Sequence, residues 1–431
     1  MSYVLQCIRA SAHLFYIGTA SGYDRFFRFV FYMALPAALL FSAQTHGGSF
    51  VDKGAWITSP YGGWSGYTNR INYVDVNGDG LQDILIGPDG YGRWFVVQSN
   101  GSSFVDKGAW IPASPYAGWS GYTDRINYVD VSGDGLQDIV LGPDGYGKWF
   151  VLQSTGSGFV DKGAWITSSP YSVWWNNTNR INFADVNGDG LQDIVLGPDA
   201  SGKWFVVQST GSSFVDKGSW IPSSPYGGWS GYTDRIHFVD VDGEGSGLRD
   251  IVMGPDANGK WFVVQSTGSS FVDKGAWVTS PYGGWVGSTN RIHFVDVNGD
   301  GLQDIIIGPD ANGKWFVVQC RGSSFVDKGA WIPTSAYGGW DNSSNRINYV
   351  DVNGDGLQDI VIGPDANGKW FVLQSTGSGF VDKGAWITSP YGGWSGYTDR
   401  IHYVDVSGDG LQDIVIGPDG NGKWFVVQTV R

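Results

Sequence analysis

Acidic and amide side chains recur in short clusters along this chain, and their spacing is its clearest chemical signal. The first cluster offers ligand atoms from Asp75, Asn77, Asp79, Leu81 and Asp83. Oxygens at positions 1, 3, 5 and 9, a backbone carbonyl at position 7 and a glycine at position 6 match the first three quarters of an EF-hand calcium loop. No glutamate stands at position 12, so the spacing predicts a calcium loop that is followed by a strand.

Five further clusters keep this spacing. Their expected ligands are Asp130, Ser132, Asp134, Leu136, Asp138; Asp185, Asn187, Asp189, Leu191, Asp193; Asp296, Asn298, Asp300, Leu302, Asp304; Asp351, Asn353, Asp355, Leu357, Asp359; and Asp405, Ser407, Asp409, Leu411, Asp413. The two serines are weaker ligands than the asparagines. The fourth cluster along the chain, with Asp240, Asp242, Glu244 and Asp250, is two residues longer. We therefore expect calcium in six loops, and the fourth departs from the spacing behind that expectation.

Charge supports a bound cation in these loops. Carboxylates about 4 Å apart repel one another by about 1 kcal/mol per pair in water, and a divalent cation removes that penalty. The alternative remains that the Asp-Gly pairs only form hairpin turns. The net charge is −14, and because residues 1–43 contribute three arginines and one aspartate, the rest of the chain carries −16. This charge disfavours nucleic acid as a partner.

The clusters belong to a longer repeat. The sequence Phe-Val-Asp-Lys-Gly begins seven times, at intervals of 54 to 57 residues, starting at Phe50, Phe104, Phe159, Phe214, Phe271, Phe325 and Phe380. Each unit contains several short β-like runs, and 67 glycines with 15% aromatic residues argue against a helical protein. Seven such units predict an all-β, seven-bladed β-propeller of four-stranded blades over residues 44–431.

The strands of the first unit are expected at 70–76, 83–87, 94–99 and 104–111. One outer-type strand, 50–57, stands before this unit, while the last unit ends after its third strand at 424–428. We therefore expect the N-terminal strand to complete the seventh blade and to protect an otherwise open sheet edge.

The acidic loops and their flanking strands resemble FG-GAP/VCBS repeats of integrin-alpha-like propellers over residues 50–431, and the chain is also similar to calcium-containing fungal seven-bladed lectins. The resemblance implies calcium at the hairpin between the first two strands of each blade. It also implies a ligand face on the opposite side of the ring.

Aromatic, amide and arginine residues gather in the loops expected on that opposite face. Tyrosine and tryptophan rings suit sugar faces, and arginine suits sugar hydroxyls. The candidate ligand contacts are Tyr61, Trp64, Tyr67, Arg70; Tyr116, Trp119, Tyr122, Arg125; Tyr226, Trp229, Tyr232, Arg235; and Tyr391, Trp394, Tyr397, Arg400. The alternatives are that the rings only pin the loops and that the arginines pair with neighbouring aspartates.

Residues 1–43 differ from the repeats. Arg25 and Arg28 precede an apolar run at 29–41 that ends in small residues, as in a secretory signal peptide. The run is shorter than the roughly 20 residues of a membrane span, so we expect cleavage and no membrane span in the mature chain. An uncleaved anchor, or initiation at Met33, is the alternative.

These features favour a secreted or extracellular, calcium-stabilised lectin or adhesion module whose partners are glycans. The alternative is a protein-binding or structural extracellular propeller. A hydrolase or lyase is disfavoured, because His237, His293 and His402 share one position in the repeat, and no nucleophile-and-base spacing occurs. We therefore do not expect an enzyme.

Overall fold

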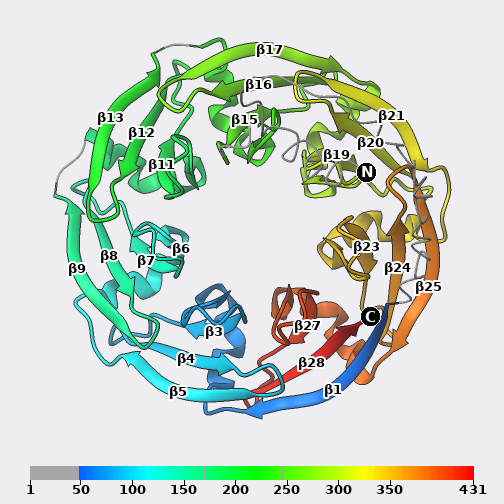
Figure 1. The fold of residues 1–431 in the computed structure, drawn as a ribbon, viewed down its shortest axis with the longest axis horizontal. Helices are drawn as coiled ribbons and strands as arrows, with labels where there is room; N and C mark the ends of the chain where they lie inside the picture. Colours follow the sequence, from blue (N-terminus) through cyan, green and yellow to red (C-terminus); the bar gives the residue numbers. More distant parts are fainter. Residues whose placement is uncertain (1–47, 168–169, 223, 244–246) are drawn as a thin grey trace, which may run out of the picture. The chain divides into compact units, whose positions relative to one another are not determined.

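A computed structural model describes residues 48–431 except 168–169, 223 and 244–246. These residues form seven four-stranded antiparallel sheets arranged in a ring (Figure 1). The predicted all-β fold with seven blades is confirmed. The predicted leader, residues 1–43, lies outside the described residues. Within the described part of the chain, no helix is both long enough and apolar enough to cross a membrane.

The first blade has the strand order expected from the sequence. Strands β2 (Ile71–Val74), β3 (Asp83–Ile86), β4 (Trp94–Ser99) and β5 (Phe104–Ile111) run from the centre of the ring outwards (Figure 1). The third and fourth strands match the prediction, whereas the first is shorter than predicted because Arg70 belongs to a short 3-10 turn.

The other blades repeat this order. Blade 2 has β6 (Ile126–Val129), β7 (Asp138–Leu141), β8 (Trp149–Ser154) and β9 (Phe159–Ile166). Blade 3 has β10 (Ile181–Ala184), β11 (Asp193–Leu196), β12 (Trp204–Ser209) and β13 (Phe214–Ile221). Blade 4 has β14 (Ile236–Val239), β15 (Asp250–Met253), β16 (Lys260–Ser266) and β17 (Phe271–Thr279). Blade 5 has β18 (Ile292–Val295), β19 (Asp304–Ile307), β20 (Trp315–Cys320) and β21 (Phe325–Ile332). Blade 6 has β22 (Ile347–Val350), β23 (Asp359–Ile362), β24 (Lys369–Ser375) and β25 (Phe380–Thr388). Blade 7 has β26 (Ile401–Val404), β27 (Asp413–Ile416) and β28 (Lys423–Val430), and its outer strand is β1 (Ser49–Thr58).

Two short 3-10 turns precede the inner strand of each blade. In chain order they are η2 (Gly62–Gly66), η3 (Thr68–Arg70), η4 (Ala117–Gly121), η5 (Thr123–Arg125), η6 (Pro170–Asn176), η7 (Thr178–Arg180), η8 (Gly227–Gly231), η9 (Thr233–Arg235), η10 (Pro281–Gly287), η11 (Thr289–Arg291), η12 (Gly338–Asn342), η13 (Ser344–Arg346), η14 (Pro390–Gly396) and η15 (Thr398–Arg400). The sequence reasoning treated these segments as loops.

The ends of the described chain join in one sheet. Strand β1 pairs antiparallel with β28, from Ser49 opposite Val430 to Thr58 opposite Lys423. The predicted closure of the seventh blade by the N-terminal strand is therefore confirmed. Without β1, the backbone groups of β28 would form an open edge.

The core lies between neighbouring blades. Each blade contributes one tryptophan from its third strand, and these side chains are fully buried: Trp94, Trp149, Trp204, Trp261, Trp315, Trp370 and Trp424. Trp94 packs in one cluster with Leu85 of its own blade and with Ile126 and Ile139 of the next blade. These tryptophans are therefore central to the packing between blades.

A belt of side-chain hydrogen bonds links neighbouring blades before their inner strands. Thr68 Oγ1 donates to Asp399 Oδ2 at 2.7 Å, and Asn69 Nδ2 donates to Thr123 Oγ1 at 2.7 Å. The same positions are joined by Thr178 with Asp124, Asn179 with Thr233, Thr289 with Asp234, Asn290 with Ser344, and Asn345 with Thr398. These seven contacts run around the whole ring and fix the spacing of its loops.

Three histidines lie in the wall between inner strands. His402 stacks on Tyr73 of the next blade with ring centroids 4.4 Å apart, and His237 and His293 contact Phe294 and Tyr349 in the same way. Burial lowers the pKa of each histidine to about 4. The neutral imidazole is therefore part of the folded wall.

Replacing all three histidines with asparagine, the residue of four other blades, should improve stability in acid. A lowered histidine pKa means that stability is complete above about pH 6.5 and declines as the pH falls towards 4. At pH 4.5 we expect the free energy of unfolding to rise by on the order of 1 kcal/mol per replaced histidine. This is less than the full pKa shift would give, because the histidine side chains keep some solvent contact. Thermal melts of both proteins at pH 7.5 and 4.5 measure this, and a melting-temperature difference independent of pH would contradict it.

Candidate functional site

The first acidic loop, between β2 and β3, is organised around the side chain of Asp75. Its Oδ1 accepts a hydrogen bond from the Gly78 amide at 2.7 Å, and its Oδ2 accepts one from the Gly80 amide at 2.8 Å. Asp79 Oδ1 accepts from the Leu81 amide at 2.9 Å. The loop therefore curls around the carboxylate at position 1, as an ion-binding loop requires.

The last aspartate of each loop is buried at the start of the second strand. Asp83 is fully buried; its Oδ1 accepts from the Ser99 amide at 2.8 Å, and its Oδ2 has no hydrogen-bond partner. Burial raises the pKa of Asp83 to about 7. Burial likewise raises the pKa to about 7 at Asp193, Asp250, Asp304, Asp359 and Asp413, and to about 6 at Asp138.

The donor set suits a hard cation. A buried carboxylate resists ionisation unless a positive charge lies nearby, and the partnerless Oδ2 of Asp83 could supply a ligand bond. Carboxylate, amide and carbonyl oxygens in a flexible loop are the donors that calcium prefers. The predicted ligands of this loop therefore fit the ion.

The fourth loop, whose spacing departs from that of the other six, still brings its carboxylates together. One carboxylate oxygen from each of Asp240, Asp242 and Asp250 lies within 4.8 Å of the other two. Among the described residues, this group of three acidic side chains is close enough together to hold a metal ion. Glu244 lies outside the described residues. The longer loop thus still gathers its carboxylates, and its lower metal occupancy stays a prediction.

Neighbouring acidic loops contact each other around the ring. A Cβ on Gly78 would lie 2.9 Å from Leu136 Cδ2 of the next loop, and Gly78 has a φ of +79°, which favours glycine at position 4. The Gln82 amide donates to the carbonyl of Asp405 at 2.9 Å. An ion in one loop would therefore also stabilise the next.

Tyrosines pin the loops of the opposite face. The Tyr61 hydroxyl donates to Asp106 Oδ1 at 2.8 Å, and the Tyr61 ring is buried. The same latch joins Tyr116 with Asp161, Tyr171 with Asp216, Tyr226 with Asp273, Tyr282 with Asp327, Tyr337 with Asp382 and Tyr391 with Asp52. Of the two roles left open for Tyr61, Tyr116, Tyr226 and Tyr391, the contacts favour loop pinning.

The arginine at the end of each second 3-10 turn lies over aromatic rings. The Arg235 guanidinium carbon is 4.0 Å from the ring centroid of Tyr232 and 5.1 Å from that of Trp229. Its Nη1 also donates to the carbonyl of Pro255 at 3.1 Å. Equivalent ring contacts are made by Arg70 with Trp64 and Tyr67, Arg125 with Tyr122, and Arg400 with Trp394 and Tyr397.

Blades 3, 5 and 6 lack the tyrosine that stands three residues before the arginine, at the position of Tyr232. In blade 5 the Arg291 Nη2 donates to Ser288 Oγ at 2.7 Å, and Arg346 bonds Ser343 Oγ in the same way. Asn177 takes this place in blade 3. The exposed tyrosine is therefore an addition to the arginine rather than a requirement for holding it.

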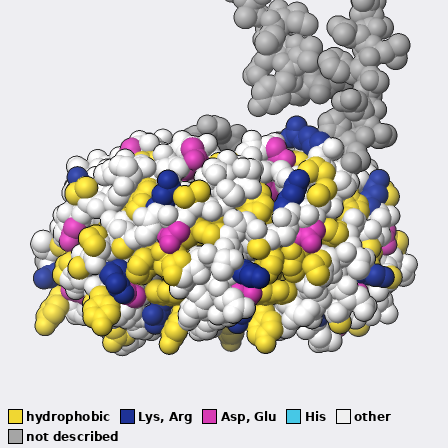
Figure 2. All heavy atoms as spheres, turned by 90° about the horizontal axis from the view of Figure 1, so that it is seen from below, with side chains coloured by type: hydrophobic (Ala, Val, Ile, Leu, Met, Phe, Trp, Pro, Cys, Tyr) yellow, Lys and Arg dark blue, Asp and Glu magenta, His cyan; other side chains and the backbone are white. Residues whose placement is uncertain are grey.

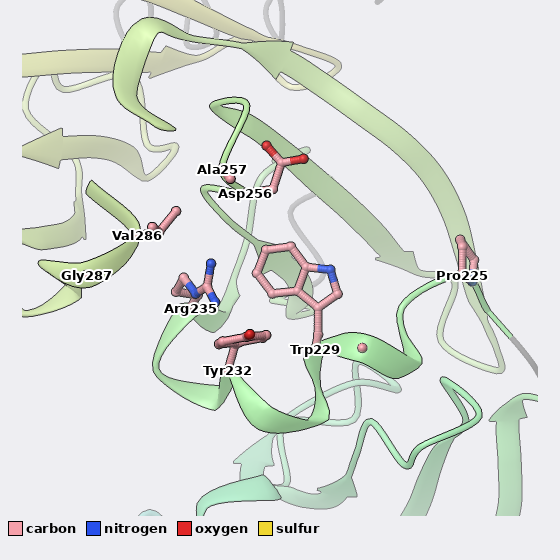
Figure 3. Close-up of a pocket in the computed structure, with 9 residues that line it drawn as sticks. Pro225, Trp229, Tyr232, Arg235, Asp256, Ala257, Val286 and Gly287 are labelled. Carbon is pink, nitrogen blue, oxygen red and sulfur yellow. The ribbon is translucent and has the colours of Figure 1, made fainter. Parts of the chain in front are cut away.

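A pocket of about 490 Å³ opens beside Arg235 at the junction of blades 4 and 5. Figure 3 shows the Trp229 ring between Asp256 and Tyr232, with Arg235 beside both rings. Pro225, Gly228 and Ala257 of the same repeat also line it, together with Val286 and Gly287 of the next. The pocket unites three predicted contact residues, Trp229, Tyr232 and Arg235, and leaves Tyr226 in the loop beneath.

Two residues that line this pocket, Asp256 and Val286, were not among the predicted contacts. Asp256 comes from the turn between β15 and β16, and Val286 comes from the following repeat. Each unit was read as a separate site, whereas the wall needs two units. The recurrence of an aspartate directly after each Gly-Pro is the signal in the sequence for the first of these residues.

The repeats themselves match a known family. The model of the FG-GAP-like repeat family matches residues 130–196 and 351–425, which include acidic loops of blades 2, 3, 6 and 7. The chain contains FG-GAP-like repeats. The resemblance seen in the acidic loops and their flanking strands is therefore confirmed.

Two similar proteins fit this assignment of FG-GAP-like repeats. Integrin alpha-3 of Cricetulus griseus is 28% identical over 171 residues, which is 37% of this chain and only 15% of that protein. A solved lectin structure of Agrocybe aegerita, which recognises non-reducing terminal N-acetylglucosamine, matches with a TM-score of 0.60 and 20% identity. The match covers 76% of this chain and 82% of the lectin chain, and it shows a shared fold.

Removing the hydroxyl of one buried loop tyrosine should lower the stability of the propeller. We expect Tyr226→Phe to destabilise the propeller by about 1 kcal/mol, because Asp273 loses its hydroxyl donor. The exposed Tyr232→Phe is the matched control and should leave the melting temperature unchanged. Differential scanning calorimetry compares the two, and equal melting temperatures would mean that the latch does not stabilise the loop.

Proposed function

We propose that this FG-GAP-like propeller is a secreted, calcium-stabilised protein that binds carbohydrate. The observation that carries the proposal is the pocket of Trp229, Tyr232, Arg235 and Asp256 at a junction of two blades. The lectin with the same fold, whose described ligand is N-acetylglucosamine, supports the choice of this sugar as the first probe.

The pocket offers both kinds of contact that a sugar needs. Trp229 and Tyr232 present apolar ring faces, on which the C–H face of a sugar can stack. Arg235 and Asp256 present donors and acceptors for hydroxyl groups. Arg235 is itself held by both rings and by Pro255, so little ordering is required when a ligand binds.

Three other blades repeat the essential residues of this site. Blades 1, 2 and 7 have the same tryptophan, exposed tyrosine and arginine, with Asp89, Asp144 and Asp419 in place of Asp256. Several weak sites on one ring would bind a glycan-coated surface far more tightly than one site binds a single sugar. An adhesive role at a cell surface would use the same property.

Calcium has a structural role in this proposal. Each ion would hold a loop that is already folded around its first aspartate and would neutralise the buried aspartate at the ninth position. Because the acidic loops lie on the face opposite the pocket, we assign the ions to stability rather than to sugar contact.

A protein-binding propeller is the second candidate, and the match to integrin alpha-3 favours it. In that case the same face would bind a protein or remain structural. A hydrolase or lyase has less support, because the three histidines of the repeats lie in the blade wall and contact rings of the next blade.

Removing the exposed tyrosines tests the carbohydrate function. A variant with Tyr67, Tyr122, Tyr232 and Tyr397 changed to serine carries the residue that blades 5 and 6 have naturally. We expect its affinity for N-acetylglucosamine to fall about tenfold, because each site loses one stacking face. Isothermal titration calorimetry measures this, and Ser288→Thr in blade 5 serves as a control that should change nothing. If the propeller binds no sugar on a glycan array but retains a protein partner from an extract of its source, the result would favour the protein-binding function.

Removal of metal tests the calcium proposal. We expect EDTA to lower the melting temperature by at least ~5 °C, because saturating calcium stabilises a single site by about 2.7 kcal/mol at one hundred times its dissociation constant. Asp193→Asn should reduce the bound calcium by about one ion in metal analysis, and Asp199→Asn in the opposite face is the control. Metal-free purified protein with an unchanged melt would disprove the proposal.

A further inference from the structure

Two exposed tyrosines break the repeat in neighbouring blades. Tyr91 and Tyr146, in the turns between the second and third strands of blades 1 and 2, have exposed fractions of 74% and 77%, the highest among the large hydrophobic residues described. The same position holds Ser201, Asn258, Asn312, Asn367 and Asn421 in the other blades. Blades 1 and 2 thus differ from the rest at one surface position.

The turn does not need these tyrosines. The Tyr91 amide donates to Asp89 Oδ1 at 2.9 Å, and the Asn258 amide makes the same bond to Asp256 Oδ1 at 2.8 Å. Since the backbone contact is identical and the ring packs against little, the tyrosine adds apolar surface without a gain in folding.

Both tyrosines directly follow two residues that correspond to lining residues of the blade 4 pocket. In blade 4 the pocket is lined by Asp256 and Ala257, whose equivalents in blade 1 are Asp89 and Gly90. Tyr91 follows directly, and consecutive Cα atoms are about 3.8 Å apart. The backbone of Tyr91 is therefore adjacent to the part of blade 1 that corresponds to the lining of the blade 4 pocket.

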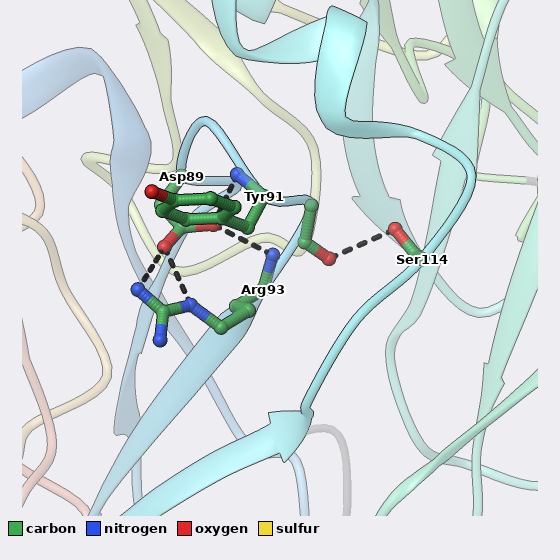
Figure 4. A network of polar contacts seen from close by, with 5 residues as sticks. Asp89, Tyr91, Arg93 and Ser114 are labelled. Carbon is green, nitrogen blue, oxygen red and sulfur yellow. Dashed lines mark hydrogen bonds and ion pairs between the residues drawn. The ribbon is translucent and has the colours of Figure 1, made fainter.

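The turn that carries Tyr91 is held in place by its neighbours. The Arg93 guanidinium carbon lies 5.1 Å from the Tyr91 ring centroid, and Arg93 Nη2 pairs with Asp89 Oδ2 at 2.6 Å. Ser114 of the next loop donates to the carbonyl of Gly92 at 2.8 Å (Figure 4). Lys148 Nζ lies 5.9 Å from the Tyr146 ring in blade 2. One ring face is thus turned towards charged groups and the other towards solvent.

The surroundings suit a sugar face better than a protein surface. Gly90 and Gly92 flank Tyr91, and Ser120 takes the place that Val286 has in the blade 4 pocket. Figure 2 shows hydrophobic side chains projecting from one rim of the ring, with charged side chains between them. Protein interfaces concentrate their binding energy in packed clusters of anchors, whereas a single ring matches one sugar unit.

We infer that the sites of blades 1 and 2 that correspond in sequence to the blade 4 pocket bind two consecutive units of a glycan, the second unit on Tyr91 or Tyr146, while the blade 4 pocket binds one. This inference rests on the proposed carbohydrate function. It makes the ring unequal: one arc is selective for chains, and the remaining pockets accept single terminal units.

The test compares N-acetylglucosamine with its β1,4-linked trisaccharide by isothermal titration calorimetry on the full chain. Wild-type protein should bind the trisaccharide about 3- to 10-fold more tightly than the monosaccharide at two sites. In Tyr91→Asn/Tyr146→Asn, which carries the residue of four other blades, this ratio should fall to about one. Asn421→Tyr in blade 7, which has the same pocket residues, should add a third site with the preference. Melting temperatures check that the variants remain folded.

Four results would overturn the inference, and they differ in how much else they would overturn. Monosaccharide binding without any trisaccharide preference, or a preference that survives the double substitution, would overturn the two-unit sites and leave the carbohydrate function standing. Loss of a protein partner in the double variant with unchanged sugar binding would assign the tyrosines to a protein interface. Absence of binding to both sugars would overturn this inference and the proposed carbohydrate function together.

Discussion

Closure of the ring by β1 against β28 is the constraint on which the rest of the structure depends. The fully buried tryptophans, the contacts between acidic loops, the polar belt and the pocket beside Arg235 all lie between two blades. A single FG-GAP-like repeat could bury none of these surfaces. Because the N-terminal strand completes the last sheet, every blade has two neighbours and each junction can be used.

The two faces of the ring solve different physical problems. On the face of the acidic loops, aspartates such as Asp83 are buried and accept hydrogen bonds from backbone amides. Burial, with a smaller contribution from the neighbouring carboxylates, raises the pKa of Asp83. On the opposite face, charge is spread instead, because each arginine lies on aromatic rings. In the proposed function, the first face would hold a compensating cation, and the second would bind a neutral, hydroxyl-rich ligand through preorganised contacts.

The sequence predicted the architecture well because each repeat corresponds to one blade, so the number of repeats gives the number of blades. Regular intervals, turn residues and the lone strand at 50–57 were enough for the number of blades and their closure. The roles of individual aromatic residues were not predictable in the same way. Tyr226 and Tyr232 stand six residues apart in one loop, yet Tyr226 is buried against Asp273 while Tyr232 is half exposed. Only the path of the 3-10 turn η8 separates them, and no periodicity encodes that path.

Near-identity of the repeats makes their differences informative. Where a change falls in the framework, its contact survives: Cys320 replaces a serine, and its Sγ lies 3.0 Å from the carbonyl of Val241, as the serines of other blades approach theirs. Changes at Tyr67, Tyr91 and their equivalents follow no such rule, because they alter the exposed surface and keep the backbone bonds beneath it. Selection on folding alone would leave such positions free to vary towards small polar residues. Large aromatic rings exposed to solvent, each beside a cation, are therefore better explained by what the propeller binds than by how it folds.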